Sequence, residues 1–301
     1  MTLVVFDYFN MLAKIFSGTV IGLDGILIEV EVDVAAQGFP GFTIVGLPDK
    51  SVGEAKERVR AAIINASFKV PDTRITVNLA PADIPKVGSA FDLPIAVGIL
   101  TASGIIKKEI LNKNLFLGEL SLRGDVRKVS GAISIALLAK SKKIKKIFVS
   151  RENISEVILV DDIEVYPVDS LINLILHLNE VKLISPFPHQ DFISLIKEEK
   201  YDYLFEDIKG QETAKRALEM AAAGFHNIIL KGPPGTGKTL LSRAFPSILP
   251  AMEKEEILEV TKIYSVAGLL QNHNFIASRP FRSPHHTTSR IGLVGGGSNP
   301  S

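Results

Sequence analysis

The glycine-rich stretch at residues 227–239, N-I-I-L-K-G-P-P-G-T-G-K-T, limits what this chain can fold into more than any other part of it. Gly232, Gly237, Lys238 and Thr239 fill the fixed positions of G-x-x-x-x-G-K-[ST], the pattern of a phosphate-binding loop. Such a loop joins a strand to a helix and places backbone N–H groups around an anion. The pattern therefore predicts a P-loop fold that binds a nucleoside triphosphate, or that descends from one that did.

The residues on both sides of the loop agree with this prediction. Residues 228–230 are apolar, as in a short buried strand, and a helical pattern starts at Leu240. Lys238 is expected to reach the β- and γ-phosphates, and the hydroxyl of Thr239 is expected to complete a Mg²⁺ shell. The expected nucleotide-binding residues are Gly232, Pro233, Pro234, Gly235, Thr236, Gly237, Lys238 and Thr239.

The composition sets outer limits on the rest of the chain. A length of 301 residues favours about two domains. A net charge of +1 recruits no nucleic acid by itself, so any such contact requires a local basic patch. The absence of cysteine excludes disulfides, zinc–thiolate sites and iron–sulfur clusters and favours a cytoplasmic protein. Asp7 and the lack of a leading basic residue argue against a signal peptide, and no apolar run is long enough to predict a membrane span.

The first part of the chain, to about Val181, mixes strand and helix patterns and predicts one α/β-type domain. Residues 26–34 alternate apolar and acidic side chains, as a half-buried strand does. A helix capped by Asp49 or Ser51 is expected to run to about Ala66. The other expected elements are strands at 42–48, 74–80 and 144–149, helices at 92–103, 130–141 and 169–178, and a hairpin at 115–126 that turns near Gly124.

Pro186 and Pro188 mark the expected linker to a second domain. Helical patterns follow at 212–223 and 253–260, and the sequence from Arg279 onward is rich in turn residues and basic side chains. The expected division of the chain is a first domain at 1–184, a linker at 185–202 and a second domain at 203–301.

Four motifs occur in order along the chain, starting at Val45, Arg74, Gly88 and Arg279. They are V-G-L-P-D-K-S-V-G-E-A-K-E-R-V-R-A-A-I, R-I-T-V-N-L-A-P-A-D, G-S-A-F-D-L-P-I-A and R-P-F-R-S-P-H-H-T. Together they resemble the magnesium-chelatase-like AAA+ ATPase family of the ComM (YifB) type. The resemblance implies an α/β protein, with an N-terminal Lon-protease-type α+β domain followed by a partial P-loop AAA+ α/β domain.

The resemblance also implies a function. Family members are ATP-dependent motors that use Mg²⁺ and form rings, expected to be hexameric, and the ComM type is regarded as a DNA helicase in branch migration during transformation or recombination. Magnesium chelatase proper is a different branch, whose motor subunit generally lacks the Lon-like front domain. The expected partners are therefore DNA and further copies of the chain, with no membrane.

The chain departs from the family pattern at both ends. Family members begin near the equivalent of Met11, so residues 1–10 are expected to be an extension or a misassigned start. A hydrolysing P-loop ATPase also needs an acidic residue at the end of a second apolar strand. The acids that follow the loop are Glu253, Glu255, Glu256 and Glu259, all in a charged helical stretch. No catalytic residue is therefore expected within this chain, and we expect nucleotide binding with negligible hydrolysis; sensor residues and an arginine finger would also lie beyond Ser301.

A protease function for the first domain is not expected. Residues 118–131 resemble a Lon signature, and Ser89 falls where the Lon nucleophile would be. A Ser–Lys pair needs an amine to take the hydroxyl proton, and the matching position is Ile133, which has no proton chemistry.

The adjacent residues His285 and His286 are poorly placed to share a metal, because neighbours point apart on either a strand or a helix. With Arg279, Arg282 and Arg290 nearby, they could face a nucleic-acid backbone or the bound nucleotide, or lie in a solvated loop.

Two further segments carry open alternatives. The basic run of Lys142, Lys143, Lys145 and Lys146 has no interleaved stacking aromatics and is typical of a solvated helix end rather than a nucleic-acid site. Asp207, Gly210 and Gln211 resemble the segment beside the adenine in AAA+ proteins, or else they cap the helix that starts at Glu212.

Three functions follow from these expectations. The first is a DNA-linked AAA+ motor, cut off here before its catalytic acid. The second is a nucleotide-binding interaction module in which the Lon-like domain docks partners and the AAA+ part performs no work. The third is a magnesium chelatase motor subunit.

Overall fold

The computed structural model describes residues 12–111, 113–188, 201–270, 275–285, 287–289 and 292. The chain divides into two compact units, one made of Met1–His189 with Lys262–Gln271 and the other of Gln190–Thr261 with Asn272–Ser301. The domain bounds expected from the sequence remain a prediction. Residues 262–270, which the sequence placed in the second domain, group with the first unit.

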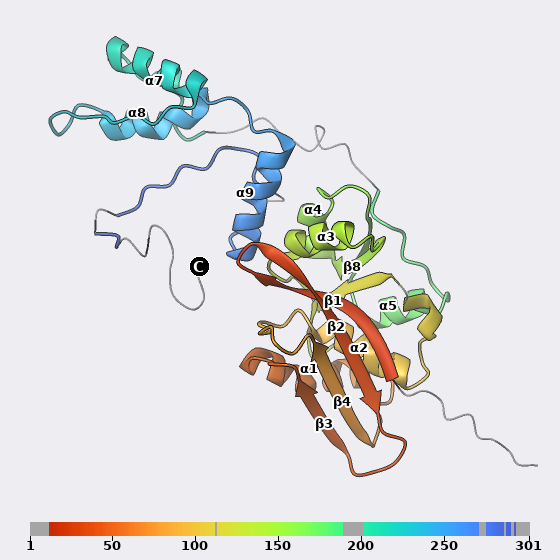
Figure 1. Ribbon diagram of the computed structural model, residues 1–301. Coiled ribbons are helices and arrows are strands. Elements are labelled where there is room, and N and C mark those ends of the chain that lie inside the picture. Colours follow the sequence, from red (N-terminus) through yellow and green to blue (C-terminus); the bar gives the residue numbers. More distant parts are fainter. Residues whose placement is uncertain are drawn as a thin grey trace, which may run out of the picture. The chain divides into compact units, whose positions relative to one another are not determined.

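A seven-stranded sheet is the centre of the first unit (Figure 1). Its strand order is β3-β4-β2-β1-β5-β8-β9. The β1–β2 and β2–β4 pairs are antiparallel and the other pairs are parallel, so the sheet is mostly parallel. The strands are β1 (Leu12–Ile21), β2 (Asp24–Val34), β3 (Gly41–Val45), β4 (Arg74–Ala80), β5 (Asn114–Leu117), β8 (Lys146–Ser150) and β9 (Glu164–Val168). The mixed α/β class expected from the sequence is confirmed.

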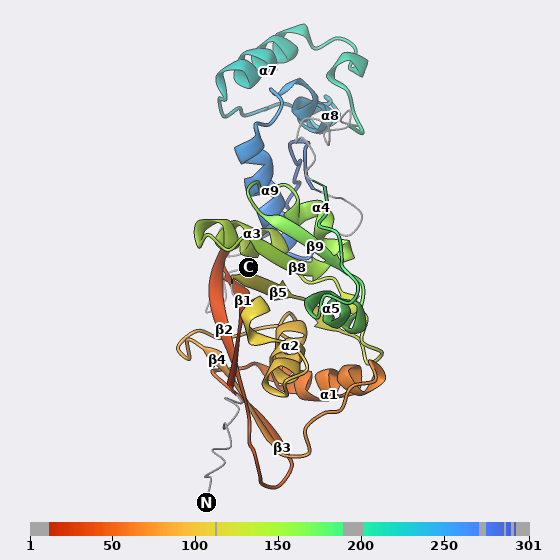
Figure 2. The same cartoon turned by 90° about the vertical axis from the view of Figure 1, so that its right-hand side faces the viewer.

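Helices cover both faces of this sheet (Figure 2). Gly98 of α2 lies against Ile15 of β1 on one face, whereas Gly18 of the same strand lies against Ile135 of α3. Because alternate residues of a strand point to opposite faces, α2 and α3 lie on opposite sides of the sheet. The longer helices of this unit are α1 (Lys50–Asn65), α2 (Asp92–Ala102), α3 (Ala132–Ser141) and α5 (Leu171–Leu178). The shorter ones are α4 (Ile154–Val157) and the 3₁₀ turns η1 (Lys108–Leu111) and η2 (Arg151–Asn153).

Two local features of the first unit are the cap of α1 and a row of stacked aromatic rings on the sheet. A carboxylate oxygen of Asp49 accepts a hydrogen bond from the backbone N–H of Val52 at 2.7 Å, which resolves the choice of cap for α1 in favour of Asp49. Phe116, Phe148 and Tyr166 face one another across neighbouring parallel strands, with ring centroids 4.9 and 4.8 Å apart. This aromatic ladder belongs to the same core as α1, α2 and α5.

The hairpin expected at residues 115–126 is only partly correct. Residues 114–117 form β5, a fully buried strand of the main sheet with parallel neighbours on both sides. The hairpin is shorter and pairs β6 (Glu119–Leu120) with β7 (Val126–Arg127), and Gly124 takes φ +91° at its turn. A short apolar run lacks the alternation that would reveal two buried faces, so the sequence did not separate β5 from the hairpin. The strand β9 was not expected, and its Pro167 is tolerated because β9 ends the sheet.

The described part of the second unit contains helices and irregular segments around a small apolar cluster. The cluster is formed by Phe205, Ile208, Leu218, Leu241 and Ala244. The helices are α7 (Glu212–Gly224), α8 (Lys238–Ala244) and α9 (Lys254–Val266), with 3₁₀ turns η3 (Phe205–Asp207) and η4 (Phe245–Ile248). Helix α9 begins in this unit, and its last residues group with the first. None of the helices in the described ranges is long and apolar enough to cross a membrane.

The strand expected at residues 228–230 is not formed. These residues have no regular structure, and the side chain of Ile229 is 92% exposed. A strand is stable only when neighbouring strands satisfy its backbone and cover its side chains. No strand occurs among the described residues of the second unit, so residues 228–230 have no such neighbour there.

Candidate functional site

The glycine-rich loop ends where helix α8 begins, at Lys238. Gly235 and Gly237 take φ values of +81° and +82°, in the left-handed region that favours glycine. These two turns bring the chain around to the first residues of α8. The pattern thus forms the tight loop that it predicts, even though the strand before it is absent.

The lysine of the loop lies against the loop itself. The Lys238 amine donates to the carbonyl oxygen of Pro233 at 2.5 Å and to the hydroxyl of Thr236 at 3.2 Å. The Thr236 hydroxyl also donates to the Pro233 carbonyl, at 3.0 Å. The charge of Lys238 is therefore held at the loop, where an anion bound by the loop would meet it.

A second segment reaches the loop from before α7. The side-chain amide of Gln211 donates to the carbonyl oxygen of Thr236 at 3.3 Å. Gln211 precedes α7 in the left-handed conformation, and its side chain makes no capping hydrogen bond. Of the two alternatives for Asp207, Gly210 and Gln211, a simple helix cap is therefore excluded for Gln211. The sequence could not show that this side chain contacts the P-loop, because the contact spans 25 residues.

The residues present fit a nucleoside triphosphate with Mg²⁺. The loop from Gly232 to Gly237 is exposed, Thr239 is exposed beside it, and Lys238 supplies the positive charge. No group of three or more His, Cys, Asp or Glu residues in the described ranges could hold a metal ion. A Mg²⁺ ion at Thr239 would therefore take its other ligands from phosphate, water and residues outside these ranges.

The acidic residues after the loop lie where the sequence placed them, on or next to a helix. Glu255, Glu256 and Glu259 belong to α9, and Glu253 comes just before it. Glu256 forms an ion pair with Arg279, whose guanidinium donates to both carboxylate oxygens at 2.9 and 3.1 Å. This pair lowers the pKa of Glu256. None of these acids ends a strand in the described part of the chain.

The basic loop near the end of the chain is described only in part. His285 Nδ1 lies 2.7 Å from the Thr287 hydroxyl, whereas His286 and Arg290 fall outside the described residues. Arg279 also donates to the carbonyl oxygen of Pro250, so its main contacts hold the loop in place. In the lysine run, Lys142 is the C-cap of α3 and Lys143 follows it, and the Lys146 amine lies 3.9 Å from a carboxylate oxygen of Glu164.

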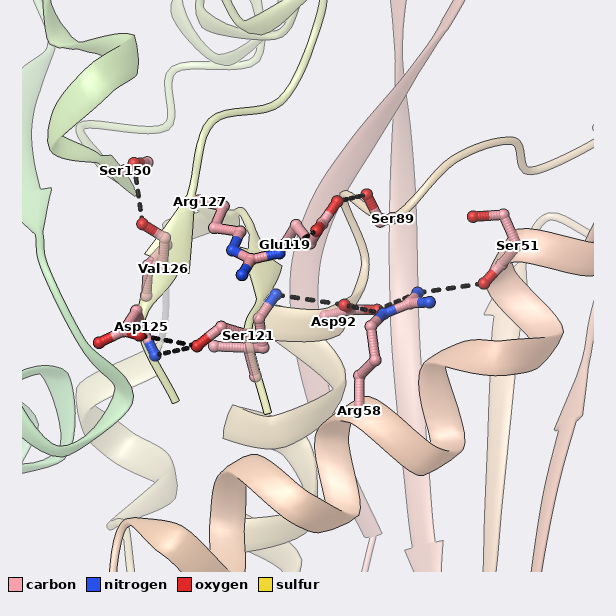
Figure 3. Close-up of polar contacts among 11 residues, drawn as sticks. Ser51, Arg58, Ser89, Asp92, Glu119, Ser121, Asp125, Val126, Arg127 and Ser150 are labelled. Carbon is pink, nitrogen blue, oxygen red and sulfur yellow. Dashed lines mark hydrogen bonds and ion pairs between the residues drawn. The ribbon is translucent and has the colours of Figure 1, made fainter. Parts of the chain in front are cut away.

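In the first unit, Ser89 lies beside Glu119 (Figure 3). Its hydroxyl donates to a carboxylate oxygen of Glu119, which lies 3.5 Å from the guanidinium of Arg127. Ile133 is fully buried. The serine thus has a hydrogen-bond partner, but position 133 offers it no amine, as the sequence indicated.

Next to Ser89, a buried carboxylate joins three elements (Figure 3). Asp92 of α2 is fully buried and accepts two hydrogen bonds from Arg58 of α1, at 2.7 and 3.0 Å. It also accepts the backbone N–H of Leu120, in β6, at 3.2 Å. Burial raises the pKa of Asp92 to about 6, and the Arg58 guanidinium opposes this rise. The lone acid in the apolar run at 92–103 is a visible signal of this buried site, but the pattern around it predicts only the start of a helix.

A second buried carboxylate lies elsewhere in the first unit. Glu156 accepts hydrogen bonds from the side-chain amide of Asn153 at 2.6 Å and from the hydroxyl of Ser265. The Ser265 hydroxyl in turn accepts the backbone N–H of Gly131 at 3.0 Å. Burial raises the pKa of Glu156, and the two hydrogen bonds oppose this rise. This network explains why residues 262–270 group with the first unit.

Comparison with known families gives two matches. The family model described as subunit ChlI of Mg-chelatase matches residues 30–153. The model described as magnesium chelatase, subunit ChlI, matches residues 204–301.

Individual relatives match most of the chain. Competence protein ComM of Haemophilus influenzae is 43% identical over 296 residues, which cover 96% of this chain and 57% of ComM. YifB of Escherichia coli is 40% identical over 289 residues, which cover 96% of this chain and 56% of YifB. Lon protease 2 of Bacillus subtilis is 28% identical over 191 residues, covering 58% of this chain and 34% of that protein, so this similarity is partial. The chain spans about half the length of the ComM and YifB proteins that it matches.

Proposed function

Because the chain belongs to the magnesium-chelatase-like family of the ComM and YifB type, we propose that it binds ATP with Mg²⁺ as part of a DNA-linked AAA+ motor. The motor would act in the cytoplasm as a ring, as a helicase for branch migration in transformation or recombination. The observation that carries the proposal is the P-loop, in which Lys238 lies within the turn formed by Gly235 and Gly237.

Each residue of the loop has a proposed role. The backbone N–H groups from Gly235 to Thr239 surround the phosphates, because the glycines permit close approach. Lys238 leaves the Pro233 carbonyl and neutralises the β- and γ-phosphates. Thr239 provides its hydroxyl to Mg²⁺, which when bound neutralises phosphate charge. Gln211 holds the loop through the Thr236 carbonyl, so the segment before α7 contributes to the same site.

Hydrolysis requires a group that the described residues do not provide. The acids of α9 do not end a strand, and Glu256 is paired with Arg279. We therefore assign the role of orienting water to none of the acids that follow the loop in this sequence, and expect binding without turnover by these 301 residues.

One specific observation favours the interaction module as a second candidate. Residues 228–230 have no neighbouring strand among the described residues, so the region that supports catalysis in a P-loop ATPase is incomplete there. A module of this kind would bind nucleotide without performing mechanical work.

The test is a paired measurement of Mg·ATP affinity and ATP turnover on the 301-residue chain, with and without branched DNA. Lys238→Ala should weaken Mg·ATP binding by about 10- to 100-fold, because a charge-assisted contact to phosphate is lost. Lys142→Ala, which removes an exposed lysine of the first unit, is the matched control and should leave the affinity unchanged.

The outcomes separate the two candidates. ATP binding with no turnover, together with DNA binding, supports the motor part. ATP binding without any affinity for branched DNA supports the module. Equal affinities of wild type and Lys238→Ala would overturn the nucleotide site itself. DNA-stimulated turnover would contradict our assignment of the catalytic acid.

A further inference from the structure

The two ends of the seven-stranded sheet differ in how they are protected. Beyond the terminal strand β9, the chain covers its own edge, because the backbone N–H of Phe187 donates to the carbonyl oxygen of Val165 at 2.7 Å. At the other end, β3 pairs with β4 on one side and ends the sheet (Figure 1). An edge strand presents alternate backbone N–H and C=O groups that can pair with another extended chain.

Within the described part of the chain, strand β3 itself lacks the devices that usually block such pairing. Its sequence, G-F-T-I-V, contains no charged residue and no proline. Natural edge strands are commonly protected by lysine, proline, a bulge or a covering segment. The register of β3 on β4 is regular over all five residues, from Gly41 opposite Arg74 to Val45 opposite Asn78, so no bulge interrupts it. The outer edge of β3 is therefore a regular template for one more strand.

Exposed apolar side chains surround this edge. Phe39, directly before β3, is 93% exposed. Val45, Leu47 and Val87 are also exposed large apolar residues. Val87 belongs to the loop that carries Ser89, and this loop is joined to the end of β3 because the backbone N–H of Lys86 donates to the Leu47 carbonyl at 3.1 Å. Exposed apolar residues therefore occur both on the edge strand and on the loop that is joined to its end.

The charged residues near the two ends of β3 indicate which charge a partner would carry. Arg74 lies opposite Gly41 at the start of β3, and Lys50 begins α1 shortly after its end. Both are exposed, and neither forms an ion pair with a described residue. The carboxylate of Asp49, which precedes Lys50, already accepts hydrogen bonds from the backbone N–H groups of Val52 and Gly88. Arg74 and Lys50 therefore place one exposed positive charge near each end of β3, and the exposed acidic residues nearby in the sequence include Asp83 in the neighbouring loop and Glu54 in α1.

We propose that the outer edge of β3 is a docking site for an extended peptide segment of a partner protein, with apolar residues at alternate positions and acidic residues at its ends. The peptide adds as an extra strand to β3, through backbone hydrogen bonds. Its apolar side chains cover Val45, Leu47 and Val87, and its carboxylates pair with Arg74 and Lys50. The peptide is held and not cleaved, because the Ser89 hydroxyl is bonded to Glu119 and position 133 is isoleucine.

The test uses a fluorescein-labelled peptide of alternating valine and threonine with glutamates at both ends, titrated with the full chain in fluorescence polarisation. A version with lysines at both ends tests the charge, and a version with proline at alternate positions tests strand pairing, because proline cannot donate the hydrogen bonds. We expect the glutamate version to bind at least 10-fold more tightly than either of the others. Hydrogen exchange at residues 41–47 should slow on binding.

Two variants and one control locate the site. Val45→Lys places a charge of the kind that protects natural edge strands, and it should weaken binding at least 10-fold. Ile64→Lys makes the same change at an exposed apolar residue of α1 and should leave binding unchanged. Arg74→Glu should reverse the preference, so that the lysine-flanked peptide binds more tightly than the glutamate-flanked one. Circular dichroism and Tm establish that each variant is folded, and the Arg74→Glu reversal remains a test if Val45→Lys does not fold.

Three results would overturn the proposal. The first is equal binding of the strand-forming and proline peptides, or no binding of any of them. The second is unchanged binding to Val45→Lys and Arg74→Glu. The third is self-association of the wild type that Val45→Lys abolishes, because the edge would then pair with a second copy of this chain. None of these results depends on ATP or DNA, so failure here is separate from failure of the proposed motor function.

Discussion

In the first unit the Asp92 carboxylate is buried between Arg58 and the backbone of Leu120, whereas in the second unit the Lys238 amine lies in an exposed loop and contacts that same loop. The first arrangement joins α1, α2 and β6, and removing one partner leaves a charge without water or a counter-charge. The second can exchange its contacts for those of a ligand at little cost to the fold. Substitutions in the first unit should therefore change stability, and substitutions around the loop should change binding.

The largest expected effect on stability is that of Arg58→Met in the first unit. The change leaves the buried Asp92 carboxylate without its counter-charge and should lower the free energy of unfolding by about 3–5 kcal/mol at neutral pH. Urea denaturation followed by circular dichroism measures it. Lys238→Met, a matched change in the loop, should alter the free energy of unfolding by less than about 0.5 kcal/mol. A loss of similar size in both variants would contradict the contrast between the units.

The pH dependence of stability should also come from the buried carboxylate. The folded-state pKa of Asp92 is about 6, above the ordinary 3.8, so the folded protein binds the extra proton between these values. The stabilisation from Asp92 is therefore fully present below about pH 4 and is lost as pH rises through about 6. The difference in unfolding free energy between wild type and Asp92→Asn should fall over this range by about 3 kcal/mol at most. A difference that stays constant from pH 4 to 7 would show that Arg58 keeps Asp92 ionised throughout.

A smaller effect is expected at the start of α1. Asp49→Ala removes the carboxylate that accepts the N–H of Val52, and loss of such a cap costs about 1 kcal/mol. Thermal unfolding should show a lowered Tm. Asp49→Asn is the control, because an asparagine caps a helix about as well as an aspartate. An equal loss in both variants would mean that the charge, and not the cap, is important.

The smallest effect should appear at the loop and should leave stability unchanged. Gln211→Ala removes the exposed hydrogen bond to the Thr236 carbonyl, worth about 0.5–1.5 kcal/mol, and should weaken Mg·ATP binding about 2- to 10-fold. Isothermal titration calorimetry measures the affinity. Glu219→Ala, at an exposed position of α7 that pairs with Arg216, is the control. A lowered Tm with unchanged affinity would place Gln211 in the fold and not in the nucleotide site.

Local patterns in the sequence determined several features correctly. The spacing of Gly232, Gly237, Lys238 and Thr239 predicted a tight loop followed by a helix, and α8 starts at Lys238. The alternation at 26–34 predicted β2, and the apolar face after Asp49 predicted α1. Motifs distributed along the chain identified the family, which the comparisons confirm. These features depend on residues that are near one another in the sequence, where turn chemistry, capping and periodicity act.

Only the tertiary structure decided which of these pieces meet. It placed β5 inside the main sheet, joined Asp92 to Arg58 across 34 residues, and brought Ser265 to Glu156 across 109. It also left the apolar residues 228–230 without a strand, although their composition favours one. The physical reason is the same in each case. A buried charge is stable only beside a counter-charge or hydrogen-bond donor, and a strand only beside another strand. When that partner is distant in the sequence, no local sequence pattern reveals it.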